Sequence, residues 1–175
     1  MAQKSFSVED RARFVENNID RVIAQHILFL YRYIKFYAKL AFAETTIRSI
    51  EEFSMLITVM QFQSISKTDL IKRNVIEKSS GIEIINRLIK NGMLSQQDNP
   101  NDQRSQLISL TDTGKSELFR TFEKMNTLGK ISTGELTYPE KEQLASMLKK
   151  LDDFHFENYT NKEKNSLDDY LPEIT

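Results

Sequence analysis

The chain has 175 residues, which is enough for one domain with a substantial core, and its 39% hydrophobic and 28% charged residues are typical of globular proteins. It contains no cysteine, which excludes disulfides, thiolate metal ligands and cysteine redox sensing. The net charge of −1 by itself argues against a nucleic-acid partner, but the charge is unevenly distributed. Residues 152–175 hold seven acids and two lysines, so residues 1–151 carry a net charge of +4.

The amino-terminal sequence, MAQKSFSVED, has no apolar run of the kind found in signal peptides. The most apolar stretch, residues 26–43, contains Arg32, Lys35 and Lys39 and is not predicted to span a membrane. We therefore expect a cytoplasmic protein without a membrane partner.

Residues 7–44 are predicted to form one long helix, because apolar residues recur at intervals of three and four. Phe29, Phe36 and Phe42 widen the apolar surface beyond a single stripe. So wide a face is hard to bury in a monomer of this size, which favours a helix shared with a second subunit; a plain core helix is the alternative. The residues expected at the subunit contact are Ile19, Val22, Ile23 and Leu30.

Two shorter helices follow. The first is predicted over residues 47–62, and the second begins after Ser66, which forms a helix-start pattern with Asp69. Asn74 is predicted as the turn residue before the next helix. Short helices joined by a few residues form a helix-turn-helix unit, in which the second helix is the recognition helix.

The recognition helix is predicted over residues 79–90 and ends at Gly92, which supplies a left-handed turn. The residues of its apolar stripe are Ile82, Ile85, Leu88 and Ile89. The residues of its polar face are Ser79, Ser80, Glu83, Asn86, Arg87 and Lys90. Turn-forming residues at 98–102 then separate two extended runs, which predicts a hairpin with Arg104 near its tip. A helix with a polar outer face followed by such a hairpin is the arrangement of a winged helix.

A further helix begins at residues 111–112 and is predicted to end near residue 128, with a loop over residues 129–134. Thr137 and Glu140 form another helix-start pattern. The last helix then carries leucines at helical spacing, namely Leu144, Leu148 and Leu151.

The segment from residue 77 to residue 114 resembles the winged helix-turn-helix of the MarR (multiple antibiotic resistance regulator) transcription factors. Its most specific part is the Asp-x-Arg at 102–104, followed six residues later by Leu-Thr and then by a glycine. The matching residues, in the order and spacing of the family, are Leu88, Gly92, Met93, Leu94, Asp102, Gln103, Arg104, Leu110, Thr111 and Gly114. The resemblance extends over residues 50–151 and fades at both ends.

The resemblance implies a mainly α fold with a small β-hairpin wing. It places a winged helix-turn-helix region, residues 46–111, between long dimerisation helices, residues 7–45 and 112–158. In the family the first helix and the last two interlock across a two-fold axis, which adds Leu144, Leu148 and Leu151 to the expected subunit contact. Residues 159–175 form an acidic tail that is either disordered or a docked extra helix.

The resemblance also implies that two recognition helices lie about one DNA turn apart and read a near-palindromic operator in double-stranded DNA. Arg104 would enter the minor groove with Asp102 orienting it, and the alternative is a pair of these two side chains that only pins the hairpin. The predicted DNA-contacting residues are Lys67, Thr68, Ser79, Ser80, Glu83, Asn86, Arg87, Lys90, Asp102, Gln103 and Arg104. Lys72 and Lys78 are further candidates for phosphate contacts.

Four positions depart from the family pattern: Ser80 stands where threonine is common, and Ile82 stands where serine or threonine is usual. Glu83 stands where arginine is usual, and Gln96 replaces the arginine that usually follows the Gly-Leu-Val segment. Glu83 either caps the helix in a box with Ser80 or contacts a base, since a carboxylate accepts a hydrogen bond from cytosine N4. With fewer cations, DNA binding is expected to be weaker and less salt-sensitive than is typical of the family.

No catalytic pattern is present in the sequence. His26 and His155 lie far apart, and there is no phosphate-binding glycine loop, nucleophile elbow or metal-ligand spacing. We therefore predict no enzyme activity, no metal and no cofactor.

The sequence thus predicts a homodimeric, sequence-specific DNA-binding transcriptional regulator, a repressor that responds to a small aromatic molecule. The effector is implied by the resemblance, because relatives bind anionic aromatics between the dimerisation helices and the recognition unit. Tyr33, Tyr37 and Phe53 would line that cavity, and ordinary packing of these rings is the alternative. A second hypothesis, favoured by Glu83, Gln96 and the acidic tail, is a winged-helix protein-interaction module that no longer binds DNA.

Overall fold

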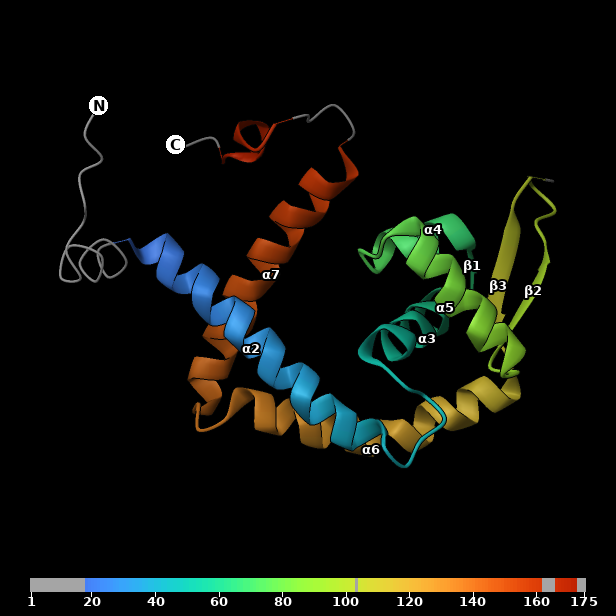
Figure 1. Cartoon of the computed structure of the whole chain (residues 1–175), viewed down its shortest axis with the longest axis horizontal. Coiled ribbons are helices and arrows are strands. Elements are labelled where there is room, and N and C mark those ends of the chain that lie inside the picture. The colour runs from blue at the N-terminus through green and yellow to red at the C-terminus, as the bar shows by residue number, and fades with distance from the viewer. Residues whose placement is uncertain (1–17, 103, 162–165, 173–175) are drawn as a thin grey trace, which may run out of the picture.

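The computed structural model describes residues 18–102, 104–161 and 166–172, which form two connected parts (Figure 1). One part consists of the long helices α2 (Ile19–Phe42), α6 (Asp112–Thr133) and α7 (Tyr138–Thr160). The other consists of α3 (Ile50–Phe62), β1 (Ser64–Ser66), α4 (Lys67–Arg73), α5 (Lys78–Lys90), β2 (Leu94–Asp98) and β3 (Gln106–Leu110). A short 3-10 helix, η1 (Asp168–Tyr170), follows α7. The predicted fold class, mainly α with a small β wing, is confirmed.

The sheet has three antiparallel strands in the order β1-β3-β2. Strands β2 and β3 form the predicted hairpin, in which Leu94 lies opposite Leu110. Strand β1 is absent from the sequence-based prediction, because three residues are too few to show an alternating pattern. Its central residue, Ile65, lies opposite Ile108, and both side chains are buried. This pairing ties the start of α4 to the wing.

The long helix α2 begins at Ile19, because the Asn18 side chain accepts a hydrogen bond from the backbone N–H of Arg21 (3.1 Å). Asn18 itself has extended backbone angles, so the predicted helix does not continue unbroken through this residue. The segment 7–17 lies outside the described residues. Asparagine side chains compete for backbone N–H groups and favour helix ends, and here that tendency outweighs the apolar periodicity.

Serine caps begin the next two helices. Ser49 accepts a hydrogen bond from the N–H of Glu52 (3.2 Å), so α3 begins later than predicted. Ser66 accepts one from the N–H of Asp69 (3.1 Å), which confirms the predicted start of α4. Asn74 is the turn residue after α4, as predicted, and its side-chain amide donates to a carbonyl of that helix (2.8 Å).

Helix α5 buries Ile85 and Leu88 as predicted, but the rest of its buried stripe differs from the prediction. Ile84 is buried, whereas Ile82 is 37% exposed, so the helix is rotated relative to the prediction. The rotation turns Gly81 toward α4, where a Cβ would lie 2.6 Å from Ile71 Cγ1. The contact between these two helices is therefore close because position 81 lacks a side chain. Gly92 follows α5 with a φ of 70°, which confirms the predicted left-handed turn.

Helix α6 is longer than predicted. It continues through Gly129 and ends before Gly134, whose φ of 50° is left-handed, so the predicted loop over residues 129–134 is wrong. Packing of the helix against α2 outweighs the weak helix propensity of a single glycine. Helix α7 begins with the predicted capping box, in which Glu140 accepts a hydrogen bond from the N–H of Thr137 (2.7 Å).

One apolar core connects the two parts of the molecule. Its fully buried side chains in the winged-helix part include Met55, Leu56, Leu70, Ile85, Leu88 and Ile108. Burial of each such side chain contributes about 1.5–3 kcal/mol. Ala38 and Phe42 of α2, together with Leu118 and Leu128 of α6, continue the same cluster. The recognition unit is therefore packed firmly against the long helices.

None of the helices in the described ranges has the length and apolarity needed to cross a bilayer.

Gly114 provides a test of the packing at the start of α6. A Cβ at this position would overlap the carbonyl oxygen of Met93, and a backbone atom cannot easily move away. Gly114→Ala is expected to lower the free energy of unfolding by about 1–3 kcal/mol, measured by chemical denaturation.

The matched control is Gly129→Ala in the same helix, where the added Cβ has nothing within 4 Å. This substitution is expected to raise the free energy of unfolding by about 0.5–1 kcal/mol, because alanine is the better helix former. The same effect for both substitutions would contradict the close contact.

Candidate nucleic-acid interface

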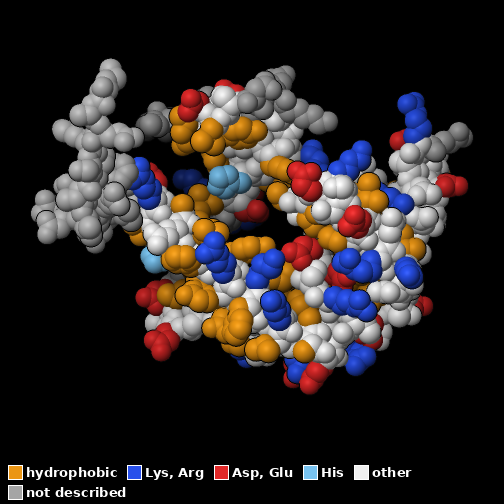
Figure 2. Space-filling view, in the orientation of Figure 1, with side chains coloured by type: hydrophobic (Ala, Val, Ile, Leu, Met, Phe, Trp, Pro, Cys, Tyr) orange, Lys and Arg blue, Asp and Glu red, His pale blue; other side chains and the backbone are white. Residues whose placement is uncertain are grey.

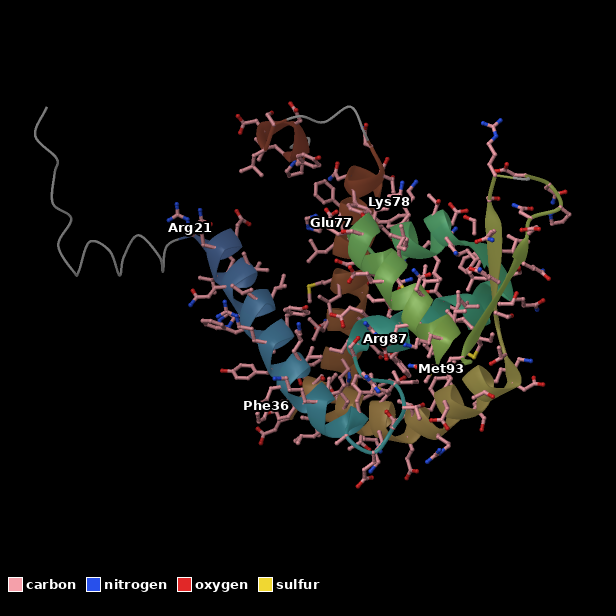
Figure 3. The ribbon with its side chains drawn as sticks, turned by 45° about the vertical axis from the view of Figure 1, so that its right-hand side comes forward. Arg21, Phe36, Glu77, Lys78, Arg87 and Met93 are labelled. Carbon is pink, nitrogen blue, oxygen red and sulfur yellow. The ribbon has the colours of Figure 1, made fainter. Side chains whose placement is uncertain are left out.

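The outward face of α5 presents polar side chains to solvent. Figure 3 shows this helix with Glu77 and Lys78 at its start and Arg87 closer to its end. The exposed polar residues on this helix include Ser79, Ser80, Glu83, Asn86 and Lys90, all five of which are predicted DNA contacts. They lie at spacings of one, three and four residues, so a partner lying along α5 would meet several of them.

Glu83 is not a helix cap. Helix α5 begins at Lys78 and has no side-chain cap, so Ser80 and Glu83 lie inside it and the predicted capping box is wrong. The sequence suggested a cap because a serine stands three residues before a glutamate, but the chain is already helical two residues earlier. The exposed carboxylate of Glu83 therefore faces any partner of α5, and a base contact remains as its predicted role.

A groove of about 780 Å³, here called the recognition groove, lies between α4, the start of α5 and the wing. Its basic lining residues are Lys67, Lys72, Lys78 and Arg104, and its acidic ones are Glu77 and Asp98. Its apolar lining residues are Ile71, Ile76 and Ile82, and Tyr159 at the end of α7 also reaches it. Thr68, another predicted DNA contact, lines the same groove. Figure 2 shows lysine and arginine side chains, with acidic ones among them, on this side of the molecule.

The wing holds Arg104 through its backbone. The N–H of Arg104 donates to Asp102 Oδ1 (3.0 Å), and the Ser105 N–H donates to the Asp102 carbonyl (2.9 Å). No ion pair joins the side chains of Asp102 and Arg104, both of which the structure describes, so the alternative of a side-chain pair that pins the hairpin is not found. Asp102 thus fixes the turn and leaves the guanidinium exposed at the tip. Gln103, the remaining predicted wing contact, lies outside the described residues.

Arg87 is bound to a partner that the sequence analysis missed. Its Nε–H donates to Glu52 Oε1 of α3 (2.5 Å) in an ion pair whose acid is fully buried. Arg87 therefore differs from the other predicted phosphate contacts, which extend into solvent or line the groove. The only sequence signal for Glu52 is an acid in the first turn of a helix, which is usually a surface feature.

The predicted dimerisation residues lie on the exposed faces of α2 and α7. Ile19, with 67% of its surface exposed, and Ile23, with 46%, are on α2, and Leu30 on the same helix is also exposed. Leu148 and Leu151 are exposed on α7, whereas Val22 and Leu144 are half-buried. Figure 2 shows hydrophobic side chains gathered over the α2 side of the molecule.

The structure does not bring the three predicted effector-contacting rings into one cavity. Tyr33 is 58% exposed on α2, whereas Tyr37 lines a small hollow of about 190 Å³ against α6. Phe53 is half-buried and packs against the core, with its ring centroid 6.3 Å from Phe42 and 6.1 Å from Phe122. Phe53 is thus a packing residue, as the alternative interpretation expects.

Both histidines lie at the surface of the molecule. His26 is exposed on α2 and His155 is exposed on α7. The described residues contain no group of three or more His, Cys, Asp or Glu side chains that could hold a metal ion.

Residues 49–106, from the cap of α3 to the start of β3, match the model of the MarR family. No curated protein matches the chain. Among solved structures, a mutant of MarR from E. coli complexed with operator DNA is 22% identical, with a TM-score of 0.68 over 74% of this chain and 92% of that chain. BpsR from Bordetella bronchiseptica is 18% identical, with a TM-score of 0.68 over 74% of this chain and 98% of that chain. The transcriptional regulator SlyA is 17% identical, with a TM-score of 0.70 over 78% of this chain and 96% of that chain. These structures share the fold described above, and the MarR family model matches the winged-helix part of this chain.

Proposed function

We propose that the chain is a homodimeric transcriptional regulator that binds double-stranded DNA sequence-specifically. The observation that carries the proposal is the continuous surface formed by the exposed polar face of α5 and the recognition groove with its four cations. Side chains such as Ser79 and Asn86 can hydrogen-bond to base edges in the major groove, and the lysines can contact phosphates. The similarity to MarR complexed with operator DNA supports this use of α5.

Two features support a dimer: the exposed apolar faces of the long helices, and the two-fold symmetry needed to contact both halves of an operator. We assign residues 7–45 and 112–158 to dimerisation and residues 46–111 to DNA binding. Apolar side chains exposed on both α2 and α7 favour a partner subunit, because large exposed apolar patches are unfavourable in water. One α5 reads half of a near-palindromic operator, so two copies related by a two-fold axis are needed for the whole site.

The recognition groove also suggests how a small molecule would act. It combines apolar side chains with lysines and an arginine, which suits a small aromatic anion. The same groove belongs to the proposed DNA surface, so a bound anion would compete with DNA. A protein that binds its operator without the ligand and leaves it with the ligand acts as a repressor. BpsR, whose DNA binding is regulated by 6-hydroxynicotinic acid, is a precedent of the same fold.

A protein-interaction module is the second candidate function. Glu83 and Gln96 are exposed where cations would strengthen phosphate contacts, and Asp168 and Asp169 of η1 are exposed acids. Gel-shift titration against the promoter region of the chain's own gene separates the two candidates. A shifted band at micromolar concentrations of the dimer supports DNA binding if its intensity falls steeply as the salt concentration rises, because phosphate contacts release counterions. Absence of any salt-dependent band would favour the protein-interaction module.

Arg104 is the wing residue whose loss should weaken DNA binding most clearly. Its guanidinium is exposed at the tip while its backbone is held by Asp102, so Arg104→Ala removes a contact without loosening the turn. Operator binding is expected to weaken by about 1–3 kcal/mol, measured by gel shift. Arg120→Ala on α6 is the control, because it removes the same charge from an exposed position away from the wing. An unchanged affinity for the Arg104 variant would leave that residue without a DNA contact.

Ile23 provides a test of the dimer. A charge at this exposed apolar position would be buried without a partner in the proposed interface, so Ile23→Asp should shift the protein from dimer to monomer in sedimentation velocity. Gln25→Asp is the matched control, because it adds the same charge two residues along on a different side of α2. The proposed interface is wrong if both variants remain dimers.

A further inference from the structure

Glu52 is a carboxylate in the interior of the winged helix. It is 0% exposed and lies on α3 among the core residues Met55 and Leu56. Burying an ionised carboxylate is strongly unfavourable unless it is paired and hydrogen-bonded. A buried carboxylate of this kind therefore needs a charged or hydrogen-bonding partner.

Both oxygens of Glu52 are used. Oε1 accepts from Arg87 Nε (2.5 Å), and Oε2 accepts from the backbone N–H of Arg48 (2.7 Å). Across the described residues, no buried side-chain nitrogen or oxygen lacks a hydrogen-bond partner. The carboxylate therefore links the residue before the α3 cap to the recognition helix, two segments that are far apart in the sequence.

Arg87 occupies the flank of α5, between the exposed Asn86 and the buried Leu88. Its side chain is 41% exposed, although its Nε–H points inward to Glu52. The guanidinium is planar, so a hydrogen bond at Nε fixes the plane of the whole group. Arg87 is thus held by α3 although part of its side chain is exposed on the helix that is proposed to contact DNA.

Apolar packing alone leaves α5 free to rotate slightly. The stripe of α5 that faces the core consists of Gly81, Ile84, Ile85 and Leu88, and contacts between aliphatic side chains are not directional. A charge-assisted hydrogen bond has a preferred length and angle. The close approach of Gly81 to Ile71 decides which face of α5 is buried. The Arg87–Glu52 pair then limits the remaining rotation of α5 about its axis, which affects where Ser79, Glu83 and Asn86 point.

We propose that Glu52 and Arg87 are positioning residues for DNA recognition, with Arg87 acting through its bond to Glu52 and not through a phosphate. The proposal rests on the function proposed above. Hydrogen bonding to base edges requires side chains held within about 0.5 Å of their productive positions. A small rotation of α5 would therefore remove base contacts while leaving the surface charge in place. Loss of the pair should therefore reduce discrimination between DNA sequences more than it reduces general DNA affinity.

The first arm of the test does not require DNA. Amide hydrogen exchange is compared between the wild-type protein and Glu52→Gln, a nearly isosteric change that removes the charge. Exchange of α5 amides should accelerate about tenfold or more, because a hydrogen bond to a charged group is lost, whereas α6 should be unchanged. Glu117→Gln is the matched control, because it removes the charge of an ion pair within α6 (Arg120 Nη1 to Glu117 Oε1, 2.8 Å). Equal exchange of α5 in both variants would overturn the proposal.

The second arm uses an operator selected from random DNA by the wild-type protein. Glu52→Gln and Arg87→Gln should each weaken operator binding about tenfold or more, the usual effect of losing a base contact, and should leave binding to scrambled DNA within about twofold. The double variant should bind the operator no more weakly than the weaker single variant, since both substitutions break the same pair. Unchanged operator affinity in Glu52→Gln, or additive losses in the double variant, would overturn the proposal.

Salt dependence separates positioning from a phosphate contact. If Arg87 neutralised a phosphate, Arg87→Gln would reduce the slope of log affinity against log salt by about 0.9 per contact, whereas a positioning residue leaves the slope equal to that of the control Arg120→Gln. A reduced slope would overturn the assignment of Arg87. If the wild-type protein selects no DNA fragment, the proposed function fails, and the exchange arm still decides whether the pair holds α5.

Discussion

Thr111 holds three elements together at one point. Its N–H donates to the carbonyl of Met93 (3.1 Å), and its hydroxyl donates to the carbonyl of Gly92 (2.5 Å) while accepting from the N–H of Gly114 (2.9 Å). The left-handed turn at Gly92 brings the end of α5 to this point, and the missing side chain of Gly114 allows the start of α6 to approach it. The recognition helix, the base of the wing and the long helix α6 therefore meet in one compact joint, on which the geometry of the candidate DNA surface depends.

The features that could be predicted from the sequence are those decided within a few residues. The start of α4 at Ser66, the capping box at Thr137, the left-handed turn at Gly92 and the hairpin of the wing all follow from local hydrogen bonding and backbone preference. Their order along the chain is enough to indicate a winged helix, because turn residues mark the joints between the elements.

The features that could not be predicted depend on contacts between distant residues. Whether Ile82 or Ile84 faces the core is decided by the close approach of Gly81 to α4, which no periodicity reveals. The partner of Arg87 lies on another helix, and an acid in a first helical turn is usually exposed, so Glu52 gave no sign of burial. Likewise, α6 continues through Gly129 because α2 packs along it. Tertiary packing outweighed local propensity in each case.

Helix α6 runs without interruption from the joint at Thr111 to its packing against α2 (Figure 1). With 22 residues it is about 33 Å long. Such a rod acts as a lever: a tilt of about 10° at the α2 end would displace the wing end by roughly 6 Å, more than the 3.4 Å rise between neighbouring base pairs. In the proposed dimer, a modest change in how the two subunits pack would thus be enough to move the two α5 helices out of register with the grooves of the proposed DNA site.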